Sequence, residues 1–461
     1  MLFSSHVFLF AFLPSILLVY YFSPRQIRIP VLLLWSLAFY GWGEPVYLFL
    51  MIGTIVLNYF FGAWIHTRQS KGSGAKGVLA AGVVTNLLIL GFFKYAGFFV
   101  TQLKVLLPFM AGVRAPEIAL PIGISFYVFQ SMSYLIDVYR QDAPVQKNVL
   151  TFGTYVTLFP QLIAGPIVRY SDVASQMTDR KESLEKFASG VQRFIIGLGK
   201  KLLLANPMGN VWELLQEQNG TAAAWVGIVA YSLQIYFDFS GYSDMAIGLG
   251  RMFGFEFLEN FNYPYISATV TEFWRRWHIS LSTWFKEYVY IPLGGNRKGL
   301  PRQIINLLVV WGLTGFWHGA SWNFLLWGLY YAVLLILEKL FLLKWLQKLP
   351  KFVGHLYSLL AVMLGWVLFF FEDMGQLGVF FAKLFTPTAT NVEAVNLILG
   401  FGPLLLVSCV AATPLLKNWG DRLQNTKFIR YGKLAACGVI FFLCVAALAS
   451  NSYNPFIYFR F

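Results

Sequence analysis

Histidine is the side chain best suited to move a proton near neutral pH, and this chain contains five. His6 lies at the N-terminal edge of the first apolar run, and His66 and His355 adjoin basic loops, so these three are most simply interfacial. His278 and His318 instead lie in segments rich in tryptophan. A neutral imidazole is a common general base for activating a hydroxyl toward an acyl donor, which makes these two the leading candidates for catalysis.

His318 lies far along an apolar run that begins after a basic loop ending near Arg302. A helix that starts at Gln303 and rises about 1.5 Å per residue covers about 22 Å before it reaches His318. Because the hydrocarbon core of a bilayer is about 30 Å thick, we expect this imidazole inside the membrane and past its midplane. Activity that depends on a neutral His318 is expected to fall at acid pH.

Small residues surround His318. Gly315, Gly319 and Ala320 leave room for a substrate or for a break in the helix at that depth. The flanking side chains of Trp317, Trp322 and Asn323 favour a functional site. Asn323 could orient the reacting groups of that site. The alternative is a buried structural histidine that only hydrogen-bonds a neighbouring helix.

His278 lies in a run of alternating aromatic and basic residues at positions 271–282. Helical spacing predicts one amphipathic, interfacial helix, with four residues on one face: Trp274, Trp277, His278 and Leu281. Arg275 and Arg276 point elsewhere and could bind the phosphates of a donor at the cytoplasmic mouth of a passage lined by His278. The alternative is an aromatic belt with snorkelling arginines.

Further charged residues could support this site. Arg297 and Lys298 end a glycine-containing basic loop at 291–298, which is either an anion site or an ordinary cytoplasmic turn. Residues 301–337 contain no Asp or Glu, so a carboxylate that orients His318 must come from a distant segment. Asp238 and Asp244 are the candidates, together with Glu272. No Gly-x-Ser-x-Gly motif surrounds Ser321, which argues against a serine hydrolase.

The composition places these segments in a membrane. The 461 residues are 57% hydrophobic and 12% charged, about half the charge of soluble domains. At about 20 residues a span, with loops as long again, the length allows about ten to twelve transmembrane helices in an all-α polytopic fold. The net charge of +14 lies in short loops between apolar runs, which fixes orientation and argues against nucleic-acid binding. The three cysteines show no metal-ligand or disulfide spacing, so we predict no metal site.

Basic loops predict which ends face the cytoplasm. If Arg25, Arg28 and the loop at 68–76 are cytoplasmic, the N-terminus is extracytoplasmic, and the same count places residues 451–461 outside. Residues 169–201 are predicted to form a cytoplasmic loop with an amphipathic helix. We interpret residues 1–461 as a single membrane domain without a soluble appendage.

Several motifs give the chain a family resemblance. Phe-Trp-Arg-Arg-Trp-His-Ile-Ser-Leu-Ser at 273–282, Tyr-Ile-Pro-Leu-Gly-Gly-Asn-Arg at 290–297 and Phe-Trp-His-Gly-Ala-Ser-Trp-Asn at 316–323 resemble the membrane-bound O-acyltransferase (MBOAT) family. More narrowly, they resemble its bacterial branch, typified by the membrane subunit of alginate O-acetyltransferase. Further matches at 159–167, 237–244 and 455–461 extend the likeness over nearly the whole chain, and 238–323 contains the catalytic block.

The resemblance implies a ring of helices with re-entrant and interfacial segments, in which a cytoplasmic tunnel and an extracytoplasmic funnel meet at His318. His278 corresponds to the family's second histidine. The implied reaction carries an acetyl group from acetyl-CoA, a substrate and not a bound cofactor, across the bacterial inner membrane to an exported polysaccharide such as alginate. An extracytoplasmic SGNH-type acetyltransferase is the implied partner.

The aromatic tail at 451–461 suggests a relay. Related D-alanyl systems use a small partner whose aromatic tail offers a tyrosine, and the tail here could fold back into the funnel in the same way. We therefore hypothesise that Tyr458 accepts the acetyl group and passes it to the extracytoplasmic partner. The alternative is that Tyr453, Tyr458 and their Phe neighbours only anchor the membrane interface.

Two other functions stay open. A D-alanyl or longer-chain lipid O-acyltransferase of the same family would differ in tunnel width, which the sequence does not give. A transporter of polysaccharide or lipid precursors would use buried Asp137, Asp238 and Asp244 to couple ions or hold substrate. Against transport, the two halves of the chain show no similar hydropathy pattern of the kind that inverted repeats leave.

Overall fold

The computed structural model describes residues 1–163, 165–422, 427–450 and 456–457, and within these ranges the chain is helical and contains no strand. The all-α prediction is therefore confirmed. The chain divides into two compact units, one formed by residues 1–191 and 246–258, the other by residues 192–245 and 259–461. The interpretation of the chain as one membrane domain stays a prediction.

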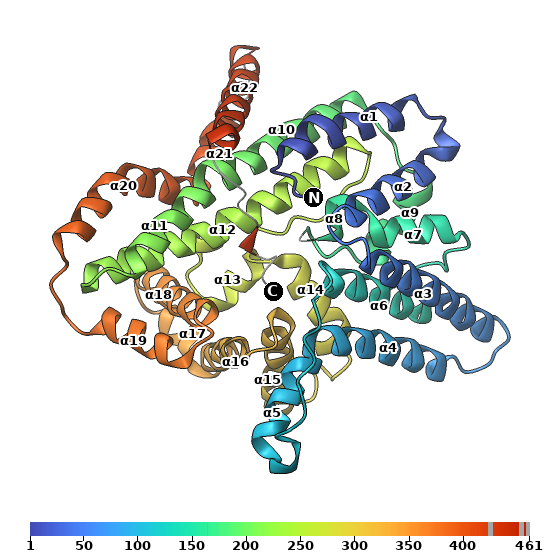
Figure 1. The fold of residues 1–461 in the computed structure, drawn as a ribbon, viewed down its shortest axis with the longest axis horizontal. Helices are drawn as coiled ribbons and strands as arrows, with labels where there is room; N and C mark the ends of the chain where they lie inside the picture. The colour runs from blue at the N-terminus through green and yellow to red at the C-terminus, as the bar shows by residue number, and fades with distance from the viewer. Residues whose placement is uncertain (164, 423–426, 451–455, 458–461) are drawn as a thin grey trace. The chain divides into compact units, whose positions relative to one another are not determined.

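The first unit contains the N-terminal helices. These are α1 (Leu13–Phe22), α2 (Arg28–Gly41), α3 (Tyr47–Ser70), α4 (Lys76–Leu90), α5 (Ala96–Leu106), α6 (Ile124–Arg140), α7 (Val149–Thr157), α8 (Phe159–Leu162) and α9 (Tyr170–Thr178). The almost fully buried α6 packs against α3 and α4, and α2 packs against α7 (Figure 1). The Asn148 side chain begins α7 by accepting hydrogen bonds from the amides of Leu150 and Thr151, which would otherwise be unsatisfied.

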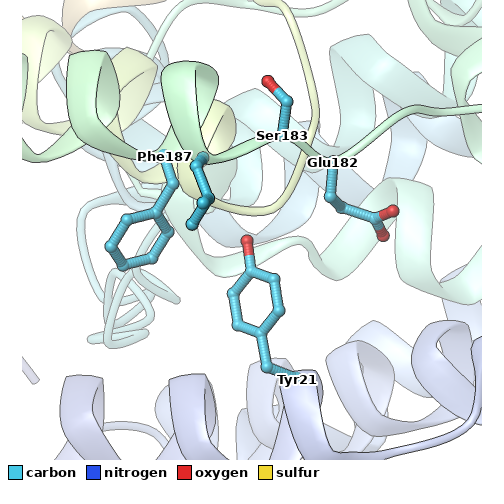
Figure 2. A pocket seen from close by; sticks show the side chains of 5 residues that line it. Tyr21, Glu182, Ser183 and Phe187 are labelled. Atoms are coloured by element: carbon cyan, nitrogen blue, oxygen red, sulfur yellow. The ribbon is translucent and has the colours of Figure 1, made fainter.

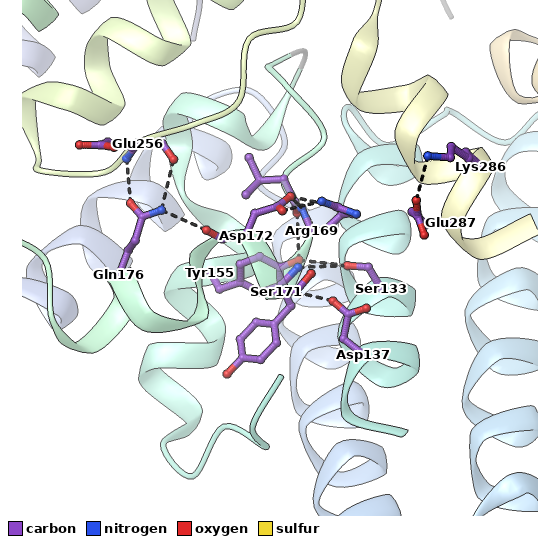
Figure 3. A network of polar contacts seen from close by, with 12 residues as sticks. Ser133, Asp137, Tyr155, Arg169, Ser171, Asp172, Gln176, Glu256, Lys286 and Glu287 are labelled. Atoms are coloured by element: carbon purple, nitrogen blue, oxygen red, sulfur yellow. Dashed lines mark hydrogen bonds and ion pairs between the residues drawn. The ribbon is translucent and has the colours of Figure 1, made fainter. Parts of the chain in front are cut away.

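The first unit contains a network of polar contacts between α6, α7 and α9 (Figure 3). Asp137 accepts a hydrogen bond from the Ser171 amide at 3.1 Å, in the first turn of α9. Tyr155 donates to the Val168 carbonyl at 3.0 Å. Asp137 is thus placed at the start of a helix, where a negative charge is stabilised by the free amides.

The second unit contains the C-terminal helices. These are α11 (Asn206–Gln216), α13 (Val270–Arg276), α14 (Ile279–Phe285), α15 (Leu300–His318), α16 (Trp322–Leu337), α17 (Leu343–Leu346), α18 (Lys351–Phe370), α19 (Met374–Phe385), α20 (Val392–Ala411), α21 (Leu415–Arg422) and α22 (Lys427–Ser450). Two helices, α10 (Leu184–Gly199) and α12 (Thr221–Met252), contribute residues to both units. Within the second unit α15, α16 and α18 pack in sequence, and this group holds the candidate site (Figure 1).

Seven helices in the described ranges are long and apolar enough to cross a membrane. They are Tyr47–Ser70, Lys76–Leu106, Thr221–Met252, Trp322–Leu346, Lys351–Phe370, Val392–Ala411 and Tyr431–Ser450. Phe8–Phe22 and Met374–Phe385 are shorter apolar helices. The protein is therefore a multi-pass membrane protein.

Glycines let two backbones approach closely in the second unit. A Cβ at Gly197 would lie 2.7 Å from the Met245 amide nitrogen, and one at Gly241 would lie 2.8 Å from the Gly197 carbonyl oxygen. Real side chains do not tolerate such distances, so both positions require glycine. The contact brings the end of α10, and the π-helical turn Lys200–Ala205 that follows it, against the middle of α12.

Candidate active site

His318 is the last residue of α15, and the helix breaks directly after it. Gly319 is fully extended, with φ −169° and ψ 155°, and α16 begins at Trp322. The predicted break is therefore confirmed. The expected room for a substrate beside Gly315 and Gly319 is wrong, because a Cβ at either position would collide with Phe324. These glycines serve the close packing of α15 against α16.

Aromatic rings enclose His318, which is 3% exposed. Its ring lies 4.9 Å from Trp317, 5.0 Å from Trp327 and 5.3 Å from Phe369, measured between centroids, and all three contacts are edge to face. Trp327 in turn contacts four further rings, those of Trp274, Trp311, Tyr331 and Trp366. We call these seven aromatic side chains the aromatic cage.

His278 lies at a break between α13 and α14. The predicted single amphipathic helix at 271–282 is wrong, because Trp277 is extended and His278 is left-handed at φ 42° and ψ 54°. Residues 260–262 pair with this break: Asn262 donates its amide to the Arg276 carbonyl, and Ile279 donates to the Asn260 carbonyl. A non-glycine residue at positive φ is uncommon and is held only by its surroundings.

Asn260 orients the His278 ring. Its Oδ1 lies 3.1 Å from Nδ1 of His278 and also accepts hydrogen bonds from the amide and hydroxyl of Ser280. Nδ1 is therefore assigned as the protonated nitrogen, which leaves Nε2 as the basic one. Burial lowers the pKa of His278 to about 3, so its imidazole is neutral at physiological pH.

Trp317 brings the two histidines into one cluster. Its ring contacts His318 at 4.9 Å and His278 at 6.2 Å, and Phe239 also packs on His278 at 4.7 Å. The two histidines are 40 positions apart in the chain, so the sequence alone did not place them together. A shared aromatic cluster around two imidazoles can exclude water.

The aromatic cage also contains buried hydrogen-bond donors. The indole N–H groups of Trp274 and Trp327 and the hydroxyl of Tyr331 have no hydrogen-bond partner in the described part of the chain. Buried donors without partners are costly in a finished fold and are often completed by a ligand. Beside an imidazole, such donors can stabilise the negative charge that develops on an acyl oxygen.

The described partners of Asp238 and Asp244, two of the three candidate carboxylates, are cations and a backbone amide. Asp238 forms an ion pair with Lys201 at 2.5 Å and accepts a hydrogen bond from the Ile457 amide. Asp244 pairs with Lys200 at 2.7 Å and with Arg193 at 2.6 Å. Orientation of His318 by either carboxylate stays a prediction.

Asn323 supports the aromatic cage through hydrogen bonds to the backbone of α18. It is fully buried, and its side-chain amide donates to the Phe369 carbonyl at 3.2 Å and to that of Leu368 at 3.4 Å. This ties the first turn of α16 to the last turn of α18. Asn323 therefore holds Phe369 against His318.

The four predicted donor-binding cations differ in their surroundings. Arg276 pairs with Glu272 at 2.9 Å and donates to the Asn262 carbonyl, which stabilises the break before His278. Arg275, Arg297 and Lys298 have exposed side chains. A phosphate group could reach these three most readily, whereas Arg276 is half-buried in its ion pair.

Tyr458 lies outside the described residues, as does most of the tail at 451–461. Phe456 and Ile457 are described. Phe456 is 1% exposed and packs edge to face on Tyr242 of α12, with centroids 4.5 Å apart. This part of the tail therefore packs within the second unit.

The described cavities lie away from both histidines. One, of about 330 Å³, belongs to the first unit and is lined by Tyr21, Glu182, Ser183, Leu184 and Phe187 (Figure 2). Another, of about 650 Å³, is lined by residues of α20. His318 is enclosed by the aromatic cage. The meeting of a tunnel and a funnel at this ring stays a prediction.

A sequence model of the MBOAT, membrane-bound O-acyltransferase family matches residues 140–371, which include both histidines. The chain is 39% identical to "Probable alginate O-acetylase AlgI" of Azotobacter vinelandii, with all of both chains covered. It is 36% identical to the peptidoglycan O-acetyltransferase of Helicobacter pylori, over 80% of this chain and 77% of that one. Teichoic acid D-alanyltransferase of Bacillus subtilis is 27% identical over 49% of this chain and 60% of that one.

The helical membrane fold and the family match define a membrane-embedded acyl-transfer protein. The chain belongs to the membrane-bound O-acyltransferase family, and it is an O-acyltransferase.

Sequence reasoning missed several residues of this site. Asn260 and Phe369 come from segments distant from the histidine they contact, and Trp327 and Tyr331 come from the helix after His318. Trp327 and Tyr331 are four residues apart and share a face of α16, a spacing that could have pointed to them. Lys201 gave no such signal, because it lay within a run of ordinary cytoplasmic cations.

Proposed function

We propose that this protein transfers an acetyl group from cytoplasmic acetyl-CoA across the membrane, for O-acetylation of an exported polysaccharide. The full-length similarity to alginate O-acetylases carries the proposal. The presence of His278 and His318 in one aromatic cluster supports it, because acyl transfer to a hydroxyl needs a base in a site without competing water.

His318 is the proposed general base. It takes the proton of an acceptor hydroxyl while the hydroxyl oxygen attacks the thioester carbonyl. The carbon–sulfur bond then breaks, coenzyme A leaves as a thiolate, and the proton returns to its sulfur. The Trp274, Trp327 and Tyr331 donors would bind the carbonyl oxygen as it becomes negative.

His278 and the surface cations are proposed to serve the donor. His278 is held by Asn260 and contacts the same Trp317 ring as His318, a suitable place to position the thioester. Arg275, Arg297 and Lys298 would bind phosphates of acetyl-CoA at the cytoplasmic face. Tyr458 would be the first acceptor, and an extracytoplasmic acetyltransferase of the SGNH type would receive the acetyl group.

Membrane vesicles with acetyl-CoA sealed inside test the proposal. Purified protein reconstituted with its extracytoplasmic partner is expected to consume internal acetyl-CoA and to acetylate alginate outside. A failure to consume acetyl-CoA, with a D-alanyl or long-chain acyl donor consumed in its place, would contradict the acetyl assignment. Movement of polysaccharide without acetyl-CoA would favour transport.

The ionic contacts argue against the transport alternative. The three carboxylates that would couple ions have described partners: Asp137 caps α9, and Asp238 and Asp244 are paired with cations. A carboxylate that cycles its charge during transport must be released from such partners at each turn.

A further inference from the structure

The most deeply buried ion pair in the described part of the chain joins Lys201 to Asp238. The Nζ and Oδ1 atoms are 2.5 Å apart, and each side chain is 2% exposed. Removing two charges from water is expensive, and the pair is tolerated only if further contacts satisfy both groups. The aromatic tail makes one such contact with each member of the pair.

Each member of the pair touches a different residue of the tail. Oδ2 of Asp238 accepts a hydrogen bond from the Ile457 amide at 2.8 Å. The Lys201 ammonium lies 4.8 Å from the centre of the Phe456 ring, within the range of a cation–π interaction. Tyr242, one turn after Asp238 on α12, packs against the edge of the same ring.

The neighbouring ion pair serves as an internal comparison. Lys200 precedes Lys201 in the same π-helical turn, yet it binds Asp244, which Arg193 also binds. The described contacts of Asp244 involve no tail residue. Two adjacent lysines thus bind two carboxylates of one helix, and among the residues that the structure describes only the second pair contacts the tail. Single π-helical turns often occur at functional sites.

The pair is also connected to the candidate active site. Phe239, the residue after Asp238, packs edge to face on the His278 ring at 4.7 Å. Asp238 and Phe239 are successive residues of α12, so the carboxylate that binds the tail and the ring that contacts His278 come from the same turn of this helix.

We propose that Lys201 and Asp238 form a docking clamp for the aromatic tail and act as positioning residues that hold residues 456–457 against the turn of α12 whose Phe239 contacts His278. The docking stands on the contacts alone, whereas the positioning of an acyl-accepting tyrosine rests on the proposed function. The clamp and the tail stabilise each other, because release of the tail would leave Oδ2 of Asp238 without its amide donor and Lys201 without its ring.

Docking is tested by the accessibility of a cysteine at position 457, which keeps the backbone amide. The full chain carries Ile457→Cys, with Cys409, Cys437 and Cys444 replaced by alanine, and is labelled with a water-soluble maleimide. Asp238→Asn is expected to raise the labelling rate at least about tenfold, because the tail opens locally. The neutral double variant Lys201→Met with Asp238→Leu is expected to do the same without leaving a buried unpaired charge.

Asp244→Asn is the matched control, since it weakens the neighbouring ion pair on the same helix and is expected to leave the labelling rate at position 457 unchanged. Equal labelling in the parent and the double variant would overturn the clamp. Equal acceleration by Asp244→Asn would also overturn it, because the effect would then be general loosening.

Positioning is tested by removing the amide donor without touching α12. Ile457→Pro lacks the N–H that Asp238 binds, whereas Ile457→Ala keeps it, and the proline variant is expected to lower acetyl transfer about tenfold relative to the alanine variant. Equal transfer rates would overturn the positioning role. If the parent transfers no acetyl group, the proposed function has failed, and the labelling experiment still decides whether the clamp exists.

Discussion

The His318 imidazole is surrounded by rings, and the proposed mechanism makes it the base for acyl transfer. His318→Ala is expected to lower acetyl transfer by about 10²–10⁴-fold, the usual contribution of general-base catalysis. The measurement is acetyl-CoA consumption by reconstituted protein. His66→Ala is the matched control, since His66 is exposed near the end of α3, and it should leave the rate unchanged. Full activity of the His318 variant would remove the histidine from the mechanism.

The donors of the aromatic cage can be separated from its packing. Trp327→Phe keeps an aromatic ring against His318 but deletes the buried indole N–H. We expect kcat to fall about 10- to 100-fold with little change in KM, because an oxyanion donor acts mainly in the transition state. Trp345→Phe, at an exposed position, is the control. A change in KM alone would indicate that Trp327 only shapes the binding site.

Burial of neutral His278 makes stability depend on pH. Burial lowers the pKa of His278 to about 3. Between pH 6.5 and 3 the His278 ring therefore stays neutral in the folded protein, whereas the same ring takes up a proton in the unfolded chain. Stability is therefore fully present above about pH 6.5 and is lost as the pH falls toward 3. At pH 5 the loss from this group is about 2 kcal/mol.

The difference in melting temperature between pH 7.5 and pH 5, measured in detergent, tests this effect. His278→Gln cannot take up the proton and should show a smaller difference than the parent. An identical pH dependence in the two proteins would mean that His278 ionises in the folded state.

Single residues were the level at which the sequence was most informative. Both histidines stood out because an ionisable side chain among tryptophans in an apolar segment is unusual. Their partners could not be read in the same way, because Asn260 and Phe369 reach the histidines through the folding of distant segments. The shared contact with Trp317 is likewise a property of the fold.

At the scale of elements, helical periodicity led to a wrong prediction where tertiary contacts break the helix. The aromatic spacing at 271–282 fits a helix, yet residues 260–262 pair with the backbone at Arg276 and Ile279 and break it there. Helix propensity is a weak prior against such contacts. The break after His318 was foreseeable, since two glycines and a serine follow or flank that turn. The residue that these glycines pack against, Phe324, could not be foreseen from the sequence.

The close approach of α10 to α12 predicts a specific sensitivity. Gly197→Val must push the α12 backbone away, since even a Cβ would lie 2.7 Å from the Met245 amide. Overpacking of this kind costs about 1–3 kcal/mol, and we expect a clearly lower melting temperature in detergent. Gly53→Val in α3 is the matched control, because a Cβ there meets nothing within 4 Å. Equal melting temperatures of the two variants would show that α10 and α12 separate without cost.

For the whole molecule, composition alone predicted the helical membrane class, because so few charges cannot cover a soluble protein of this length. The number of membrane-spanning helices was harder to predict from the sequence. Length arithmetic allows ten to twelve, whereas seven helices of the described ranges qualify by length and hydropathy. The 32 residues of α12 exceed one span, and short helices such as α7 and α13 use chain without crossing, so no uniform length applies.

Orientation in the membrane is the remaining property at this scale, and it decides from which side acetyl-CoA can arrive. The loop between α3 and α4 carries Lys71 and Lys76, and cationic loops stay in the cytoplasm, whereas the segment after α5 lies beyond the span Lys76–Leu106. In a cysteine-free chain, Gly112→Cys is therefore expected to react with an impermeant maleimide in intact cells, and Ser73→Cys only after permeabilisation. The reverse pattern would place the N-terminus in the cytoplasm and Arg275 and Arg297 on the extracytoplasmic side, where no coenzyme A thioester is available. The proposed direction of transfer would then be wrong even if the chemistry at His318 were right.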